Sequence, residues 1–130
     1  MFPKQIAIID DEEEMEDIYS LILEPILKNN LATIKFYSDS RTFLAEYESN
    51  LPDLILCDIN MPHLDGPALC HQIRESGHQT RICFVSGHNH RDYLKVMDAL
   101  DVDRFFSKPL NPMDVLSSCE QDLGLLPANS

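Results

Sequence analysis

Three short runs of this sequence are almost continuously apolar, and each ends abruptly on a polar side chain. They occupy residues 6–10 (IAIID), 54–58 (LILCD) and 82–86 (ICFVS). A strand that is apolar at every position has both faces covered, as in a parallel sheet with helices on each side. The chain is therefore expected to fold around a buried parallel sheet, with polar side chains gathered where its strands end.

Amphipathic stretches separate the apolar runs and predict a helix after each strand. Strands are expected at residues 5–9, 32–37, 54–57, 81–85 and 104–106. Helices are expected at 15–26, from a cap at 38–40 to 47, at about 66–75, at 93–100, and from 112 to near 124. Pro25 should kink or shorten the end of the first helix, and Asn111 before Pro112 is a well-matched helix start. Five strand–helix pairs predict one α/β domain, a doubly wound five-stranded parallel sheet flanked by five helices.

The length and charge of the chain limit the functions and partners that it can have. With 130 residues it suffices for one domain, and 22 acidic residues against 10 Lys and Arg give a net charge of −12. Such a surface repels nucleic acid and favours a divalent cation or a basic protein surface as partner. The four cysteines are widely spaced, which favours free buried thiols in a reducing compartment. Because the sequence has neither a membrane-spanning run nor a signal-peptide layout, a cytoplasmic protein is expected.

Acidic residues follow the first and third expected strands. Asp10 and Asp11 come directly after the first, and Asp58 ends the third. Because the carboxyl ends of parallel strands share one edge of a sheet, these three carboxylates should meet there and bind a cation, with Mg²⁺ as the best match to oxygen ligands. Seven of the eight residues 10–17 are acidic, and a solvated first helical turn explains Glu12 and the acids that follow it better than ligation does.

The other strand ends carry side chains suited to phosphoryl transfer. Asp58 can act as a phosphoryl-accepting nucleophile or simply cap its strand. Ser86, before Gly87, can donate to a phosphoryl oxygen or sit in an ordinary turn, and Lys108 can pair with Asp58 or lie in a surface turn. Each alternative is reasonable alone. The presence of all three residue types at the strand ends, together with the acidic pair, favours phosphoryl transfer to a carboxylate.

Together these residues resemble the CheY-like receiver domain of two-component response regulators. The matching pieces, in the family's order and spacing, are Asp10-Asp11, the Asp58-x-x-Met61-Pro62-x-x-x-Gly66 run, Ser86-Gly87 and Lys108-Pro109. The resemblance covers essentially residues 4–123, with residues 1–124 expected as the receiver domain and residues 125–130 as a tail or the start of a linker. It implies a flavodoxin-like fold with strand order 2-1-3-4-5.

The resemblance also implies a role for each site residue. Asp58 would accept a phosphoryl group from a histidine kinase or a phosphotransfer protein. Asp10, Asp11, Asp58 and the backbone carbonyl of Asn60 would hold Mg²⁺, and Ser86 and Lys108 would bind phosphoryl oxygens. Such a domain is a phospho-acceptor with self-catalysed phosphorylation and dephosphorylation rather than an enzyme. Asn60 also matches a position that tunes phosphoryl lifetime in the family, as does His88.

The resemblance further implies a switch. Ser86 would move toward the phosphoryl group, and Phe105 would fill the space that it vacates. The surface expected to respond comprises the fourth helix, fifth strand and fifth helix, which would bind a downstream protein, an output domain or a second copy of the chain. One departure from the family lies at Asp101, where Asp would adopt the left-handed turn conformation that Gly usually supplies.

Three other functions compete with this one. An FMN-binding flavodoxin needs a phosphate loop after the first strand, where this chain has acids. A haloacid-dehalogenase-type phosphatase needs a general acid two residues after its nucleophile, where this chain has Asn60. A receiver-like interaction module that is never phosphorylated remains the serious alternative.

Overall fold

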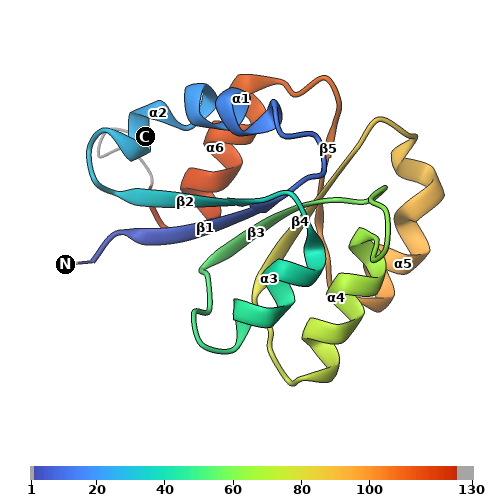
Figure 1. Cartoon of the computed structure of the whole chain (residues 1–130). Helices are drawn as coiled ribbons and strands as arrows, with labels where there is room; N and C mark the ends of the chain where they lie inside the picture. The colour runs from blue at the N-terminus through green and yellow to red at the C-terminus, as the bar shows by residue number, and fades with distance from the viewer. Residues whose placement is uncertain (1, 126–130) are drawn as a thin grey trace.

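The computed structural model describes residues 2–125, and its centre is a five-stranded parallel sheet with helices on both faces (Figure 1). The strands are β1 (Lys4–Ile9), β2 (Ala32–Tyr37), β3 (Leu54–Asp58), β4 (Arg81–Ser86) and β5 (Arg104–Ser107). They lie in the order β2-β1-β3-β4-β5, and each neighbouring pair is parallel. The doubly wound, flavodoxin-like fold and its strand order are confirmed.

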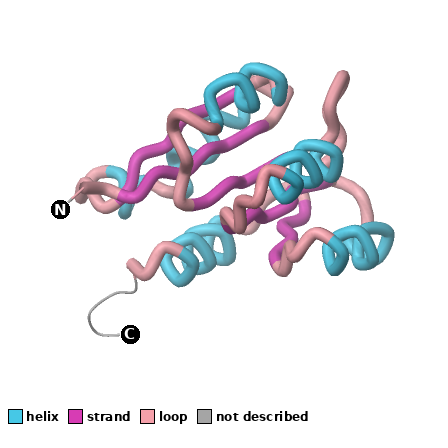
Figure 2. The backbone as a smooth tube through the Cα atoms, turned by 90° about the horizontal axis from the view of Figure 1, so that it is seen from below, coloured by secondary structure: helices cyan, strands magenta, loops and turns pink. Residues whose placement is uncertain are grey.

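The helices form a layer on each face of the sheet. They are α1 (Met15–Ile22), α2 (Glu24–Leu27), α3 (Ser40–Tyr47), α4 (Gly66–Glu75), α5 (Leu94–Ala99) and α6 (Pro112–Asp122), with a 3-10 helix, η1 (His90–Tyr93), before α5. In Figure 1, α1, α2 and α6 cover one face, while α3, α4 and α5 cover the other. Figure 2 shows the strands running side by side between the helices.

The apolar core divides along the same two faces. Ile6 and Ile8 of β1 belong to a buried cluster with residues of α1, α2 and α6. Ala7 and Ile9 belong to a second cluster with residues of α3, α4 and α5. Successive side chains of a strand point to opposite faces, so a strand buried on both sides needs apolar residues at every position. This requirement explains the continuous apolar runs.

The helices differ from expectation in two places. The single helix expected at 15–26 is divided, because α1 ends at Ile22 and α2 begins at Glu24, with Pro25 in its first turn. Proline lacks an N–H donor and clashes with the preceding turn, so the helix cannot continue through it. The helix expected at 93–100 begins instead as η1 and becomes α-helical at Leu94. The described residues therefore contain six α-helices rather than five.

The local signals for turns and caps are confirmed. The Asn111 side chain accepts hydrogen bonds from the backbone N–H groups of Met113 and Asp114, at the start of α6. Asp101 has a φ of 58°, the left-handed conformation expected there. None of the helices within residues 2–125 is long and apolar enough to span a membrane.

Two arginines, Arg74 and Arg104, connect helices α4, α5 and α6 to neighbouring segments through hydrogen bonds and ion pairs. At the end of α4, Arg74 donates hydrogen bonds to the carbonyls of His78, Thr80, Leu100 and Asp101. In β5, the Nε atom of Arg104 lies 2.9 Å from Oδ2 of Asp122 on α6. The Asp122 side chain is only 4% exposed, and Arg81 approaches it to 3.5 Å. These contacts tie the ends of α4, α5 and α6 to the sheet.

Candidate functional site

The candidate site lies where β1, β3, β4 and β5 end at one edge of the sheet. Asp10 follows β1, Asp58 is the last residue of β3, Ser86 is the last residue of β4, and Lys108 follows β5. The backbone aligns these ends, because the Asp10 N–H donates to the Tyr37 carbonyl and the Lys108 N–H donates to the Ser86 carbonyl. The residues expected to bind metal or phosphoryl oxygens are thus brought to this edge, whereas the expected switch residue Phe105 lies within β5.

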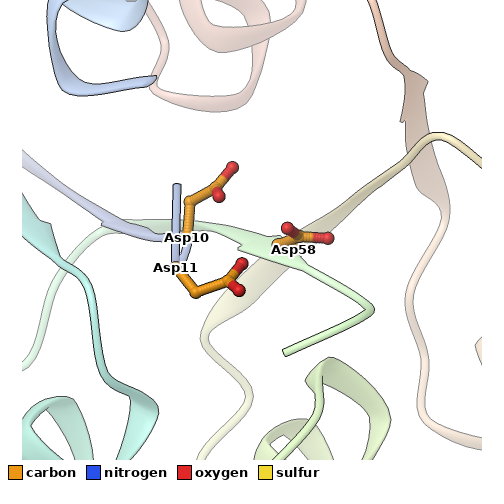
Figure 3. Close-up of side chains that lie close together, drawn as sticks. All are labelled: Asp10, Asp11 and Asp58. Atoms are coloured by element: carbon orange, nitrogen blue, oxygen red, sulfur yellow. The ribbon is translucent and has the colours of Figure 1, made fainter. Parts of the chain in front are cut away.

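Three carboxylates converge at the centre of this edge, as Figure 3 shows for Asp10, Asp11 and Asp58. One oxygen from each lies within 4.8 Å of the other two. Asp10 and Asp58 are buried, whereas Asp11 is exposed to solvent. Converging carboxylates repel one another, and this arrangement therefore favours a positive charge between them.

The unfavourable electrostatic environment of these carboxylates is clearest at Asp10. Burial raises its pKa from 3.8 to about 6, against the opposing effects of the Glu12 N–H, which donates to Oδ1, and of Lys108. Oδ2 lies 3.0 Å from the Lys108 ammonium nitrogen, yet no group among the described residues gives it a properly oriented hydrogen bond. A buried oxygen without a hydrogen bond, beside two further carboxylates, fits a hard divalent cation that takes oxygen ligands.

Lys108 supplies the positive charge at this edge. Its ammonium nitrogen lies 2.8 Å from Oε1 of Glu12, 3.0 Å from Oδ2 of Asp10 and 3.2 Å from Oδ2 of Asp58. Burial disfavours the charged ammonium, but its close contacts with the Glu12 and Asp10 carboxylates and the charges of Asp10 and Asp58 leave its pKa raised overall. Lys108 is therefore a fixed cation beside the Asp58 carboxylate.

Ser86 is linked to the loop that follows Asp58. Its side-chain oxygen is fully buried and accepts hydrogen bonds from the Asn60 side-chain amide at 3.2 Å and from the His88 N–H at 3.0 Å. The Asn60 N–H in turn donates to Oδ1 of Asp58 at 3.1 Å. The Asn60 residue thus joins the carboxylate at the end of β3 to the hydroxyl at the end of β4.

Gly66 lets α4 approach the backbone of this loop. A Cβ atom at this position would lie 2.7 Å from the Asp58 carbonyl oxygen and 2.9 Å from the Ile59 Cα atom. The Gly66 N–H also donates to the Ile59 carbonyl. Both neighbours are backbone atoms that cannot move without shifting the end of β3. The glycine of the sequence motif is therefore required by close packing behind the acidic site.

An open cleft of about 300 Å³ leads to these groups from solvent. It is lined by Asp11, Glu12, Asp58, Asn60, Gly87, His88 and Lys108. Phe105 lies outside this lining, half-buried, with its ring stacked on His90 at a centroid distance of 4.8 Å and on Tyr93 at 6.1 Å. The cleft admits a small group to Asp58 and leaves Phe105 on a separate surface.

Two features of this region were not foreseen from the sequence. The sequence predicts Glu12 in a solvated helical turn, and the structure shows that its exposed carboxylate also contacts Lys108, which lies 96 residues away in the chain. The His90 ring packs on Phe105, a contact for which the sequence gives no indication. Neither residue type nor local spacing carries a signal for such contacts, because they depend on how distant loops meet in the fold.

Comparisons with known proteins identify the family of the chain. Residues 6–120 match the model of the response regulator receiver domain. The chain is 31% identical over 114 residues to the Regulator of RpoS of Escherichia coli, covering 87% of this chain and 32% of that protein. It is 29% identical over 113 residues to the alkaline phosphatase synthesis transcriptional regulatory protein PhoP of Bacillus subtilis, covering 86% and 45%.

Solved structures show the same fold. A CheY-like response regulator receiver domain protein from Methanospirillum hungatei superposes with a TM-score of 0.81 at 24% identity, covering 94% of each chain. The present chain spans about half the length, or less, of the curated relatives named above. The match to the family model extends over nearly the whole described chain. The chain therefore belongs to the family of response regulator receiver domains of two-component systems.

Proposed function

We propose that Asp58 accepts a phosphoryl group from a histidine kinase or a histidine phosphotransfer protein, with Mg²⁺ as the cation held by Asp10, Asp11, Asp58 and the backbone carbonyl of Asn60. The observation that carries this proposal is the position of the Lys108 ammonium, 3.2 Å from the Asp58 carboxylate at the base of an open cleft. The converging carboxylates and the Ser86 hydroxyl at the next strand end support it.

In the proposed reaction, an oxygen of the Asp58 carboxylate forms a bond to phosphorus as the P–N bond of a phosphohistidine breaks. The electron pair of that bond returns to the donor imidazole, which takes up a proton. Lys108 is placed to neutralise charge on the phosphoryl oxygens, and the Ser86 hydroxyl can turn from its present hydrogen bonds to donate to one of them. When bound, Mg²⁺ would neutralise further charge on the transferred group.

Hydrolysis of the aspartyl phosphate completes the cycle. Water adds to phosphorus, the P–O bond to Asp58 breaks, and the carboxylate is restored with release of inorganic phosphate. The domain is then a phospho-acceptor that assists its own phosphorylation and dephosphorylation, not an enzyme with a separate substrate. Asn60 and His88, which line the cleft, stand where they can affect access of that water.

The proposed switch couples Ser86 to Phe105. Movement of Ser86 toward the phosphoryl group vacates space beside β5, and Phe105 leaves its stack with His90 to fill it. The responsive surface would consist of α5, β5 and α6. Its partner would be a downstream protein, an output domain or a second copy of the chain, in the cytoplasm. We also propose residues 1–124 as the receiver domain. Most of the tail at 125–130 lies outside the described residues.

Intact mass spectrometry after incubation with Mg²⁺ and acetyl phosphate tests the proposal. The wild type should gain one phosphoryl group, and Asp58→Asn should gain none, because its amide cannot act as the nucleophile. Omission of Mg²⁺ should prevent the gain in the wild type. Absence of phosphorylation in the wild type would favour an interaction module, and equal phosphorylation of the Asn variant would show that Asp58 is not the acceptor.

A further inference from the structure

The Lys108 ammonium nitrogen lies close to three carboxylates and donates oriented hydrogen bonds to two of them, Glu12 and Asp58. The three partners are Asp10, Glu12 and Asp58, and the contact with Glu12 is the shortest at 2.8 Å. An ammonium group has three donors and no acceptor. A phosphoryl oxygen that arrives at Asp58 therefore competes with carboxylates already gathered around the ammonium.

Glu12 is the partner best placed to be replaced. Asp10 and Asp58 are buried and belong to the carboxylate cluster, whereas the Glu12 side chain is 52% exposed and lies on the wall of the open cleft. Moving Glu12 into water therefore costs little, because its carboxylate is already half hydrated. Moving Asp10 would require rearrangement of a residue that is 1% exposed.

We propose that Glu12 is a positioning residue that holds Lys108 at rest and competes with the phosphoryl group for its ammonium. This inference rests on the proposed function of Asp58. Glu12 acts through Lys108 and through its own charge, which opposes an anionic donor in the cleft. Both effects lower the affinity of the site for a phosphoryl donor. Glu12 weakens the binding of phosphoryl donors to the resting site, and it returns to Lys108 when the phosphoryl group leaves.

Two measurements on Glu12→Gln test the proposal, with Glu13→Gln as the matched control. Glu13 carries the same charge and is exposed, but it is not among the partners of Lys108. The first measurement is the affinity for beryllium fluoride, a phosphoryl analogue, at saturating Mg²⁺ and followed by fluorine NMR. The second is the initial phosphorylation rate as a function of acetyl phosphate concentration.

The expected result is a change in half-saturation and not in maximal rate. Glu12→Gln should bind beryllium fluoride about fivefold more tightly, which corresponds to about 1 kcal/mol, and should reach half its maximal rate at a correspondingly lower acetyl phosphate concentration. The maximal rate should stay the same within about twofold, because Glu12 no longer contacts Lys108 in the complex. Glu13→Gln should change either value by less than about twofold.

Three results would overturn the inference without affecting the proposed function. They are equal changes in Glu12→Gln and Glu13→Gln, an unchanged half-saturation in Glu12→Gln, and a change confined to its maximal rate. A wild type that takes up neither beryllium fluoride nor a phosphoryl group would instead refute the proposed function.

Discussion

Replacing Asp10 with Asn should stabilise the metal-free protein near neutral pH, although Asp10 is a site residue. Its side chain is 1% exposed, and burial raises its pKa from 3.8 to about 6. A carboxyl group with a raised pKa in the folded state supports folding at low pH and opposes it once it must ionise. Asn has a similar shape and carries no charge, so the variant avoids this cost.

The size of the effect follows from the two pKa values. Each pKa unit between the folded and unfolded states corresponds to about 1.4 kcal/mol, so ionised Asp10 lowers the free energy of unfolding by about 3 kcal/mol near pH 7.5. The contribution is fully favourable below pH 3.8 and is lost as the pH rises through about 6. The advantage of Asp10→Asn should therefore fall to about half near pH 5 and nearly vanish below pH 4.

Urea unfolding followed by far-UV circular dichroism, with a chelator present, measures this difference. Asp11→Asn is the matched control, because Asp11 is exposed and its replacement should change the free energy of unfolding by less than about 1 kcal/mol. Adding Mg²⁺ should then stabilise the wild type by mass action and stabilise Asp10→Asn much less. A variant no more stable than wild type near pH 7.5, or an advantage that does not shrink toward pH 5, would refute the reasoning.

Two other substitutions test contacts that support the site. Gly66→Ala places a Cβ atom 2.7 Å from the Asp58 carbonyl oxygen, so it should cost about 1–3 kcal/mol in urea unfolding and slow phosphorylation by acetyl phosphate. An unchanged rate would mean that the loop yields without moving Asp58. Asp122→Asn leaves Arg104 without its charged partner and should cost about 2 kcal/mol, measured in the same way. A loss below about 0.5 kcal/mol would show that water replaces that contact.

The parts of the fold that depend on local chemistry could be predicted from the sequence. β2 begins and ends at the expected residues, Ala32 and Tyr37, and α4 spans Gly66–Glu75 as expected. Strand alternation and capping residues act over a few neighbours, so their signals survive without knowledge of the tertiary structure. The order of the strands could not be predicted from such local signals. It followed from the resemblance to a known family, because pairing between distant strands leaves little trace in a single sequence.

For the site, the positions of the residues could be predicted from the sequence, but the contacts between distant elements could not. The sequence placed Asp10, Asp58, Ser86 and Lys108 at strand ends, and the fold brings those ends together. It could not show that Glu12 reaches Lys108 or that Arg104 pairs with Asp122, because both pairs form between separate elements. The division of α1 from α2 was predicted only in part. Pro25 indicated that the first helix kinks or shortens there, but not that a separate helix, α2, begins around it. The catalytic and metal-binding roles of the site residues stay predictions.

Arg74 ties the carboxyl end of α5 to the segment between α4 and β4, because it donates hydrogen bonds to carbonyls of both. Leu100, whose carbonyl accepts one of these hydrogen bonds, caps the carboxyl end of α5, far from the cleft. The opposite end of α5 follows η1, where Tyr93 and His90 stack on Phe105. A displacement that starts at Phe105 therefore acts on α5 as on a lever whose pivot is the Arg74 guanidinium. Under the proposed switch, such a helix would tilt instead of sliding, and its motion would be greatest at the end beside η1.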